Sequence, residues 1–200
     1  MLYRSFGKRF CDIVLALLLL APALPLLALG ALLVAATLGR PVLFRQQRLG
    51  RDGRLIRIAK LRTMRPGPGP DAARTPRAGR FLRRTKIDEL LQLVDVLAGR
   101  LSFVGPRPLP PGIMDPADPL LPVRLSVRPG LTGWAQVSGG TLLTNPEKLA
   151  LDCFYARRVS AGVDAWIMAR TVATLLAGES RDESAIGAAI RAAQADAGRR

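Results

Sequence analysis

The longest apolar stretch of the chain is Ile13–Leu38, which contains no charged residue. As a helix it would be about 39 Å long, whereas the hydrocarbon core of a bilayer is about 30 Å thick. It also exceeds the roughly 7–15 apolar residues of a signal-peptide core, and no clear small-residue cleavage site with a polar flank follows it. The pattern therefore predicts a helical membrane segment within residues 1–40.

Cations flank this apolar run on both sides: Arg4, Lys8 and Arg9 before it, and Arg40, Arg45 and Arg48 after it. Positive residues favour the cytoplasmic side, so both flanks are expected there. Pro22 and Pro25 lie near the middle, where each removes a backbone hydrogen bond and bends a helix. We expect a re-entrant helical hairpin broken at Pro22 and Pro25. A kinked helix that spans the membrane is the alternative, because transmembrane helices tolerate proline.

Shorter patterns follow the membrane segment. Residues 42–61 carry two apolar runs, Val42-Leu43-Phe44 and Leu55-Ile56-Arg57-Ile58, on either side of the Asp52-Gly53 turn signal, and they predict a β-hairpin. Asn145-Pro146 is a typical helix start, with Asn145 as N-cap, and the helix is expected to reach about Val159. Residues 163–176 predict an amphipathic helix that lies on the bilayer or packs in the core. From Glu179 onward large apolar residues are few, which indicates a weak helix or a disordered tail.

These elements predict an α+β fold. We expect a mainly helical, membrane-associated domain with a small β-hairpin and interfacial amphipathic helices. The expected division is a re-entrant membrane helix over 1–40, a catalytic domain at the cytoplasmic face over 41–178, and a weakly structured tail over 179–200.

The central segment Phe81–Arg107 combines helical periodicity with adjacent carboxylates. Apolar residues recur at helical spacing and predict a helix over about 86–98, with Thr85 as N-cap and Asp88 in the first turn. That helix would turn Asp88, Gln92 and Asp95 away from its buried face. The apolar positions are Ile87, Leu90, Leu91, Val94 and Leu97.

Asp88 and Glu89 have two interpretations. Asp88 could simply cap the helix while Glu89 is solvated, and spacing alone does not decide against this. In the other, the helix dipole and nearby cations keep Asp88 ionised, so that its carboxylate is a usable nucleophile. Arg107 lies between Pro106 and Pro108, which restrict the backbone and can direct a planar guanidinium at a phosphate. The cations near Asp88 are Arg83, Arg84 and Lys86.

Composition excludes several kinds of site. The chain has no histidine, which excludes Ser-His-Asp triads, Cys-His pairs and histidine zinc sites. Cys11 and Cys153 form neither a CxxC motif nor a disulfide framework, which suits packing roles in a reducing compartment. Lys and Arg number 30 against 15 Asp and Glu, giving a net charge of +15. A chain this basic is expected to face nucleic acid, acidic lipid or a phosphorylated substrate.

Taken together, the membrane run and four motifs resemble the bacterial sugar transferase family, the monotopic phosphoglycosyl transferases. The resemblance extends from about Lys8 to Thr174 and covers the minimal catalytic core, without the additional transmembrane domain that precedes it in many larger members. The motifs are Lys60-Leu61-Arg62-Thr63-Met64, Asp88-Glu89-Leu90, Gly105-Pro106-Arg107-Pro108-Leu109, and the stretch from Arg128 to Val137, RPGLTGWAQV.

The resemblance implies transfer of a sugar 1-phosphate from a UDP-sugar to a polyprenyl phosphate such as undecaprenyl phosphate, with Mg²⁺ as cofactor and UMP as product. Asp88 would be the nucleophile that forms an acyl phosphate, and Glu89 would complete the dyad. Both carboxylates would also be the metal ligands. Arg107 would bind phosphate. Further substrate-binding positions implied by the resemblance are Lys60, Arg62 and Arg83, with Arg128 and Asp152 near the nucleotide pocket.

Two departures from the family pattern affect what the resemblance implies. Ala21-Pro22 stands where the family often has Ser-Pro, which removes a hydroxyl able to bond a freed carbonyl at the bend. Ser138-Gly139-Gly140 stands where the family often has Asn-Gly-Arg, which leaves the transferred sugar open. The expected location is the cytoplasmic face of a bacterial inner membrane, and the oligomeric state is left open.

Two other functions compete with this one. The first is a non-catalytic, basic, membrane-tethered protein that binds nucleic acid or anionic lipid. The few aromatic residues do not interleave with basic ones as in a stacking surface, and charge binding alone gives no reason for Asp88-Glu89. We therefore expect no nucleic-acid partner. The second is a glycosyl transferase that passes on only the sugar and releases UDP.

Overall fold

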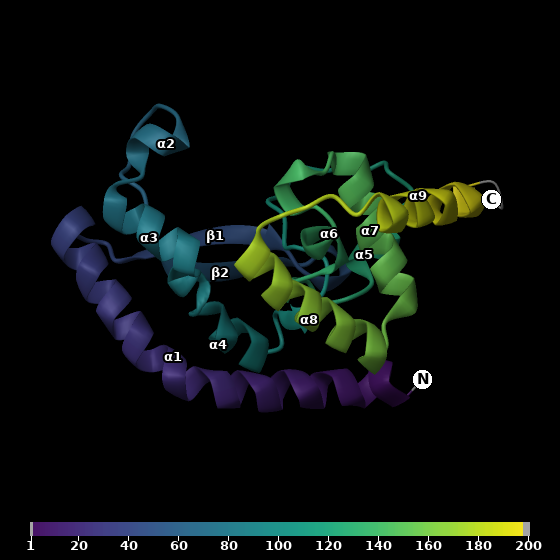
Figure 1. Ribbon diagram of the computed structural model, residues 1–200, viewed down its shortest axis with the longest axis horizontal. Helices are drawn as coiled ribbons and strands as arrows, with labels where there is room; N and C mark the ends of the chain where they lie inside the picture. The colour runs from purple at the N-terminus through teal and green to yellow at the C-terminus, as the bar shows by residue number, and fades with distance from the viewer. Residues whose placement is uncertain (1, 198–200) are drawn as a thin grey trace.

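The computed structural model describes residues 2–197 and is mainly helical, with two small two-stranded sheets (Figure 1). The helices are α1 (Lys8–Leu38), α2 (Asp71–Arg74), α3 (Arg77–Thr85), α4 (Gln92–Leu97), α5 (Leu121–Leu125), α6 (Trp134–Val137), α7 (Asn145–Arg158), α8 (Ala161–Ala177) and α9 (Glu183–Ala197). The strands are β1 (Leu43–Leu49), β2 (Leu55–Leu61), β3 (Ser102–Val104) and β4 (Gly130–Thr132).

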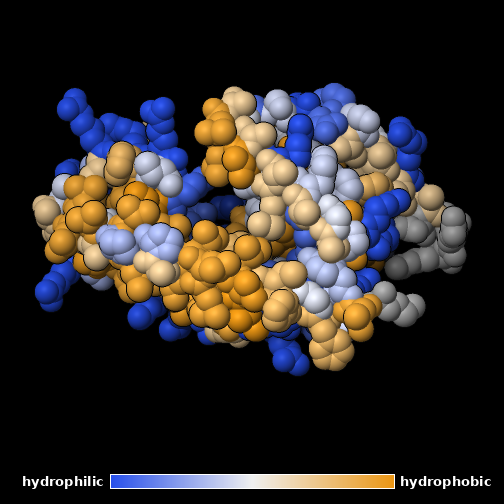
Figure 2. All heavy atoms as spheres, turned by 60° about the horizontal axis from the view of Figure 1, so that its bottom comes forward, coloured by the Kyte–Doolittle hydropathy of each residue, from blue (hydrophilic) through white to orange (hydrophobic). Residues whose placement is uncertain are grey.

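The N-terminal apolar segment forms one long helix. Pro22 and Pro25 lie inside α1, which bends near its middle and continues to Leu38, where Gly39 ends it with φ +72° (Figure 1). By length and composition this helix is apolar enough to cross a membrane. Leu18 is 66% exposed, and apolar side chains gather over the face where α1 lies (Figure 2). The predicted bend is present within a continuous helix, and the re-entrant path stays a prediction.

Polar contacts attach the first half of α1 to the core. The buried Asp12 carboxylate accepts hydrogen bonds from the Ser102 hydroxyl and the Phe103 N–H, both at 3.0 Å. The Lys8 ammonium lies 2.6 Å from the Asp164 carboxylate. Because ion pairs and hydrogen bonds of this kind are directional, they set the angle of α1 against strand β3 and helix α8.

Strands β1 and β2 form the predicted hairpin over residues 42–61. They pair antiparallel, from Leu43 opposite Leu61 to Leu49 opposite Leu55. Asp52 in the connecting turn adopts a left-handed conformation with φ 56°, as the turn signal indicates. Side chains two residues apart share a face of a strand, so Lys60 follows the buried Ile58 on the face of β2 directed at the protein interior.

The predicted helix over 86–98 is wrong at its beginning. Thr85 is the last residue of α3, and its hydroxyl donates to the carbonyl of Phe81 at 2.9 Å instead of capping a new helix. Lys86 then adopts the left-handed region with φ 59°, and a 3₁₀ turn over Ile87–Glu89 leads into the short helix α4. The apolar residues that suggested one helix are divided among the 3₁₀ turn, the two residues that follow it and α4.

The buried face of this segment also differs from the prediction. Asp88, Gln92 and Asp95 are buried, whereas Val94 is 43% exposed. The reason is that the turn and α4 lie between α1 and the β-hairpin, so they bury more than one face. A single apolar stripe does not describe a short element covered on two sides.

The C-terminal helices enclose the other side of the core. Helix α7 begins as predicted near Asn145, but the N-cap is Thr144, which forms a capping box with Glu147. Helix α8 over Ala161–Ala177 confirms the helix predicted for 163–176. The tail expected to be weakly structured contains α9, which packs on α7 and buries Ile186 and Ala189. Small side chains are enough to fill this interface because α9 lies close against α7. The last three tail positions, 198–200, lie outside the described residues.

Candidate active site

Asp88 lies at the centre of the turn between α3 and α4. The side chain is 2% exposed, and its Oδ1 atom has no hydrogen-bond partner among the described residues. Glu89 follows it with a side chain that is 25% exposed. The left-handed Lys86, an uncommon conformation for a residue with a Cβ, reverses the chain just before them. The reversal directs one carboxylate into the protein and leaves the other at a cavity wall.

Burial raises the pKa of the Asp88 carboxyl, and the neighbouring Glu89 raises it further. Lys60, Lys86 and Arg83 act in the opposite direction. The cations act on Asp88 in the expected direction, but the sequence did not show its burial, and desolvation exceeds the attraction of the cations. A buried carboxyl with a raised pKa and charged neighbours is typical of a functional group.

Arg107 is held opposite this turn by the parallel strands β3 and β4. A Cβ at Gly105 would lie 2.3 Å from the Arg128 carbonyl, so only glycine permits this close approach of the backbones. The Gly130 N–H donates to the Pro106 carbonyl at 2.9 Å, which fixes the next residue. The Arg107 guanidinium reaches Glu89 at 3.5 Å while its side chain stays 53% exposed. It is thus placed beside the carboxylates and accessible to a ligand.

Lys60 and Arg83 complete the group of cations near Asp88. Both line a cavity of about 740 Å³ between the β-hairpin and α3. Burial lowers the pKa of the Lys60 amine, whereas Glu89 and Asp88 act to raise it. Arg83 is oriented by the Thr63 hydroxyl, which accepts from its Nε at 3.0 Å. The structure therefore brings together five of the predicted site residues: Lys60, Arg83, Asp88, Glu89 and Arg107.

Two of the predicted binding residues have other partners. Arg62 lines the same 740 Å³ cavity, but its Nη2 donates to the carbonyls of Leu38 and Gly39 at 2.5 and 2.7 Å and thus closes the end of α1. Arg128 donates to the Gly99 carbonyl at 3.1 Å. It lines a separate cavity of about 100 Å³ whose wall includes none of the five residues above.

Asp152 is a third case, because it acts on the site through Arg124. The two side chains are almost fully buried and form an ion pair at 2.9 Å. Burial raises the pKa of Asp152 to about 6, and Arg124 opposes this rise. The Arg124 Nη2 atom also donates to the carbonyl of Arg107 at 2.6 Å. Asp152 therefore supports the backbone from which the Arg107 guanidinium extends.

Sequence reasoning assigned no binding role to several cations that line these cavities, although it named Lys86 as a cation near Asp88. Arg48 donates to the Pro108 carbonyl at 3.3 Å, and both burial and the charge of Arg107 lower the pKa of its guanidinium. The sequence had marked it only as a cation flanking the membrane run. Lys86 lines two cavities, of about 260 and 310 Å³, beside Arg107. Nothing in the sequence marks Lys86 as left-handed, and Arg124 gives no signal because its partner lies 28 positions away.

The carboxylates fit Mg²⁺ only together with a substrate. The described residues contain no group of three or more His, Cys, Asp or Glu side chains that would bind a metal by themselves. Mg²⁺ is usually held by one or two carboxylates together with substrate phosphates and water. Asp88, with an unpartnered buried oxygen, and the adjacent Glu89 match that arrangement.

The comparisons with known proteins agree with this arrangement. The family model named bacterial sugar transferase matches residues 3–178. The uncharacterized sugar transferase EpsL of Bacillus subtilis is 37% identical over 185 residues, which cover 86% of this chain and 88% of the relative. The UDP-glucose:undecaprenyl-phosphate glucose-1-phosphate transferase of Caulobacter vibrioides is 42% identical over 185 residues, covering 84% and 69%.

A protein of the same name from Escherichia coli is 38% identical over 181 residues, which cover 82% of this chain and 39% of the relative. The similarity thus includes the Asp88 turn, the Arg107 loop and the hairpin cations alike. The alternative of a non-catalytic binding protein finds no support in these relatives. The chain belongs to the bacterial sugar transferase family, and it is an enzyme of the sugar-phosphate transferase type.

Proposed function

We propose that this enzyme transfers a sugar 1-phosphate from a UDP-sugar to a polyprenyl phosphate, with undecaprenyl phosphate as the natural acceptor. The relatives named for this reaction support the assignment. The observation that carries it is the buried carboxylate of Asp88, whose Oδ1 has no partner, beside cations suited to a diphosphate. The reaction would be the first membrane step in the synthesis of a polysaccharide or glycoconjugate.

In the first step the Asp88 carboxylate attacks the phosphorus that carries the sugar. A bond forms between Oδ1 and this phosphorus, the bond to the UMP oxygen breaks, and UMP leaves with the electron pair of that bond. Arg107 and Lys86 stabilise the charge that develops on the phosphate oxygens. Asp88 then carries the sugar phosphate as an acyl phosphate.

In the second step an oxygen of the polyprenyl phosphate attacks the same phosphorus. The bond to Oδ1 breaks, which regenerates the Asp88 carboxylate and yields the polyprenyl diphosphate sugar. Lys60 and Arg83 line the basic cavity next to Asp88 and can hold the incoming phosphate. Both displacements occur at the phosphorus that carries the sugar, and they require no protein nucleophile other than Asp88.

Asp88 and Glu89 would hold Mg²⁺ together with the donor's diphosphate. The metal would neutralise the diphosphate and assist the departure of UMP. Glu89 is kept in place by its contact with Arg107 at 3.5 Å. Glu89 and Arg107 thereby present one negative and one positive group to the same region of a substrate.

Membrane attachment places this chemistry at the surface where a lipid phosphate lies. The bend of α1 near Pro22 and Pro25 and the cations at both of its ends support a re-entrant path from the cytoplasmic face of a bacterial inner membrane. On α8, Val172 and Leu175 are largely exposed and suit an interfacial position. Holding the carboxylate at this height increases its effective concentration toward the acceptor.

Intact mass and released nucleotide test the covalent step. Detergent-purified protein is incubated with Mg²⁺ and a panel of UDP-sugars, without lipid. We expect UMP release and a mass increase equal to one sugar phosphate, both absent in Asp88→Asn. Asp95→Asn is the matched control, because Asp95 is a buried carboxylate on the adjacent helix that is paired with Arg100 at 2.7 Å. It should load like the wild type.

Other products would contradict the proposal. Release of UDP would identify a glycosyl transferase that passes on only the sugar. Equal turnover by wild type and Asp88→Asn in the presence of acceptor would show that Asp88 is not the nucleophile.

A further inference from the structure

A polar cavity of about 310 Å³ is lined by Lys86 and Arg107 and by the buried pair of Arg124 and Asp152, but not by Asp88 or Glu89. It is also lined by an amide, a hydroxyl and a carboxylate, from Asn145, Thr141 and Glu179. The described residues that line it include no aromatic side chain on which a uracil ring could stack. Its hydrogen-bonding groups instead suit the hydroxyl groups of a sugar.

The Glu179 carboxylate is fixed at this cavity by one of its two oxygens. Its Oε2 accepts the Thr141 N–H at 2.9 Å and also the Thr141 hydroxyl. Gly140 has φ +53°, and a Cβ there would lie 2.5 Å from Oε1 of Glu179. A glycine at this position therefore gives the carboxylate the space it occupies. Oε1 takes no part in the bonds to Thr141, and a carboxylate oxygen can only accept.

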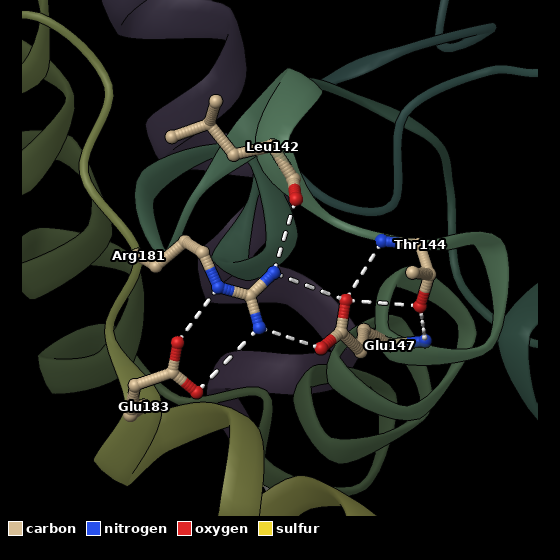
Figure 3. Close-up of polar contacts among 5 residues, drawn as sticks. All are labelled: Leu142, Thr144, Glu147, Arg181 and Glu183. Carbon is tan, nitrogen blue, oxygen red and sulfur yellow. Dashed lines mark hydrogen bonds and ion pairs between the residues drawn. The ribbon is translucent and has the colours of Figure 1, made fainter.

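Arg181 holds the backbone that carries Glu179. Its guanidinium donates to Glu147 at 2.7 Å, to Glu183 at 2.7 Å and to the Leu142 carbonyl at 3.0 Å (Figure 3). Glu147 in turn caps α7 through Thr144 (Figure 3). The segment after α8 is thus attached to the loop and helix that line the polar cavity.

We propose that Glu179 is a specificity-determining residue for the donor's sugar, and that Arg181 is its positioning residue. Oε1 of Glu179 accepts a hydrogen bond from a sugar hydroxyl, while Lys86 and Arg107 bind the diphosphate in the same cavity. This inference rests on the proposed use of a UDP-sugar. The negative charge of Glu179 also disfavours sugars that carry a carboxylate, because like charges repel. The family match ends at residue 178, so the selecting group lies just beyond the matched core.

The test compares Glu179→Gln with the wild type on UDP-glucose, UDP-galactose, UDP-N-acetylglucosamine and UDP-glucuronic acid. We expect kcat/KM for the preferred neutral sugar to fall about 10- to 100-fold, the range for loss of a hydrogen bond to a charged group. The relative use of UDP-glucuronic acid should rise, and inhibition by UMP should stay the same. Glu183→Gln is the matched control, because Glu183 is also bound to Arg181 but does not line the polar cavity, and its sugar preference should equal that of the wild type.

Arg181 is tested by the preference ratio between sugars and not by activity alone. Arg181→Ala should lower the ratio of kcat/KM between the preferred sugar and the other sugars. Arg181→Lys should restore part of this preference, because it keeps a positive charge beside Glu147. A purely structural role would lower the thermal midpoint of both variants and leave the ratio unchanged.

Binding measurements on Asp88→Asn separate this inference from the proposed reaction. Calorimetric titration of Asp88→Asn and of Asp88→Asn/Glu179→Gln with each UDP-sugar requires no turnover. Unchanged relative affinities would overturn the role of Glu179 even if the wild type releases UMP. An equal loss of affinity for all donors and for UMP would assign Glu179 to the nucleoside and overturn the sugar assignment. Altered sugar preference without UMP release would uphold the binding role and refute the proposed reaction.

Discussion

Asp88 and Asp152 are both buried aspartates, 2% and 3% exposed, and burial raises the pKa of both. They differ in their partners. Oδ1 has no hydrogen-bond partner in either side chain, but Oδ2 of Asp152 forms a buried ion pair with Arg124 at 2.9 Å, whereas no ion pair to Asp88 is present among residues 2–197. The protein neutralises the Asp152 carboxylate internally and leaves the Asp88 carboxylate for a ligand. Arg107 connects the two, because Arg124 binds its carbonyl and its guanidinium reaches Glu89.

Asp88→Asn tests the functional side of this comparison and should have the largest effect. Loss of a nucleophile is expected to reduce transfer on the order of 10³- to 10⁶-fold. Because the fold raises the pKa of Asp88, its ionised form costs stability, and the amide removes that cost. The thermal midpoint of Asp88→Asn should therefore equal or exceed that of the wild type.

The pH dependence of unfolding checks the same point. A carboxyl group whose pKa is higher in the folded than in the unfolded protein stabilises the fold fully at pH values below its unfolded pKa, near 3.9. This stabilisation is lost as the pH rises through the folded-state pKa. The advantage of Asp88→Asn over the wild type should therefore increase with pH in denaturant titrations. A variant much less stable than the wild type at pH 8 would show that the Asp88 carboxylate is a structural group like that of Asp152.

Asp152→Asn tests the structural side. It leaves the Arg124 guanidinium buried without a counter-charge, which should cost about 3–5 kcal/mol in the free energy of unfolding. Urea denaturation in detergent measures this loss. The matched control is Asp95→Asn, whose partner Arg100 is 45% exposed and can turn to solvent, so that its loss should be smaller. Equal losses in the two variants would contradict the importance of the buried pair.

The sequence predicted the elements whose signals are local. The hairpin over 42–61 follows from two apolar runs and one turn signal, and α8 follows from a long amphipathic pattern. The motif Asp88-Glu89 and the Gly-Pro-Arg loop indicated phosphate chemistry because the chemical groups themselves carry that signal. These predictions needed no knowledge of which elements pack together.

Other features depend on packing and were not predictable in this way. Thr85 matched a capping pattern, but α3 continues through it, and the left-handed Lys86 carries no residue preference that would reveal the turn. The burial of Asp88 depends on elements that cover the turn from two sides. Glu179 was assigned to a weak tail, because its contact with Thr141 joins residues 38 positions apart.

Arg107 is the link between the two aspartates, and its variants should have intermediate effects. Arg107→Ala is expected to lower kcat/KM for the UDP-sugar about 10- to 100-fold, by loss of a charge-assisted contact to phosphate. Arg107→Lys should recover only part, because an ammonium lacks the planar fork of a guanidinium. Thermal unfolding should change little in either variant, since Arg124 binds the backbone carbonyl and not the side chain. A large stability loss in Arg107→Lys would show that the side chain mainly supports the fold.

Substitution of Lys60 should have the smallest effect, because Lys60 acts on Asp88 only through its charge. Only the ionised carboxylate attacks phosphorus, so activity should fall as pH decreases through the raised pKa of Asp88, at higher pH than for an ordinary aspartate. Lys60 lowers this pKa. Lys60→Gln should therefore move the acid limb of the single-turnover rate to higher pH by about one unit.

Arg65→Gln is the control for this shift, because Arg65 lines the same 740 Å³ cavity as Lys60 and its substitution also removes one positive charge. Its acid limb should coincide with that of the wild type. An equal shift in both variants would mean that the general positive potential of the cavity sets the protonation of Asp88. A shift in Lys60→Gln alone would show that a single ammonium offsets part of the desolvation of the nucleophile, a compensation that Asp152 obtains from its ion pair with Arg124.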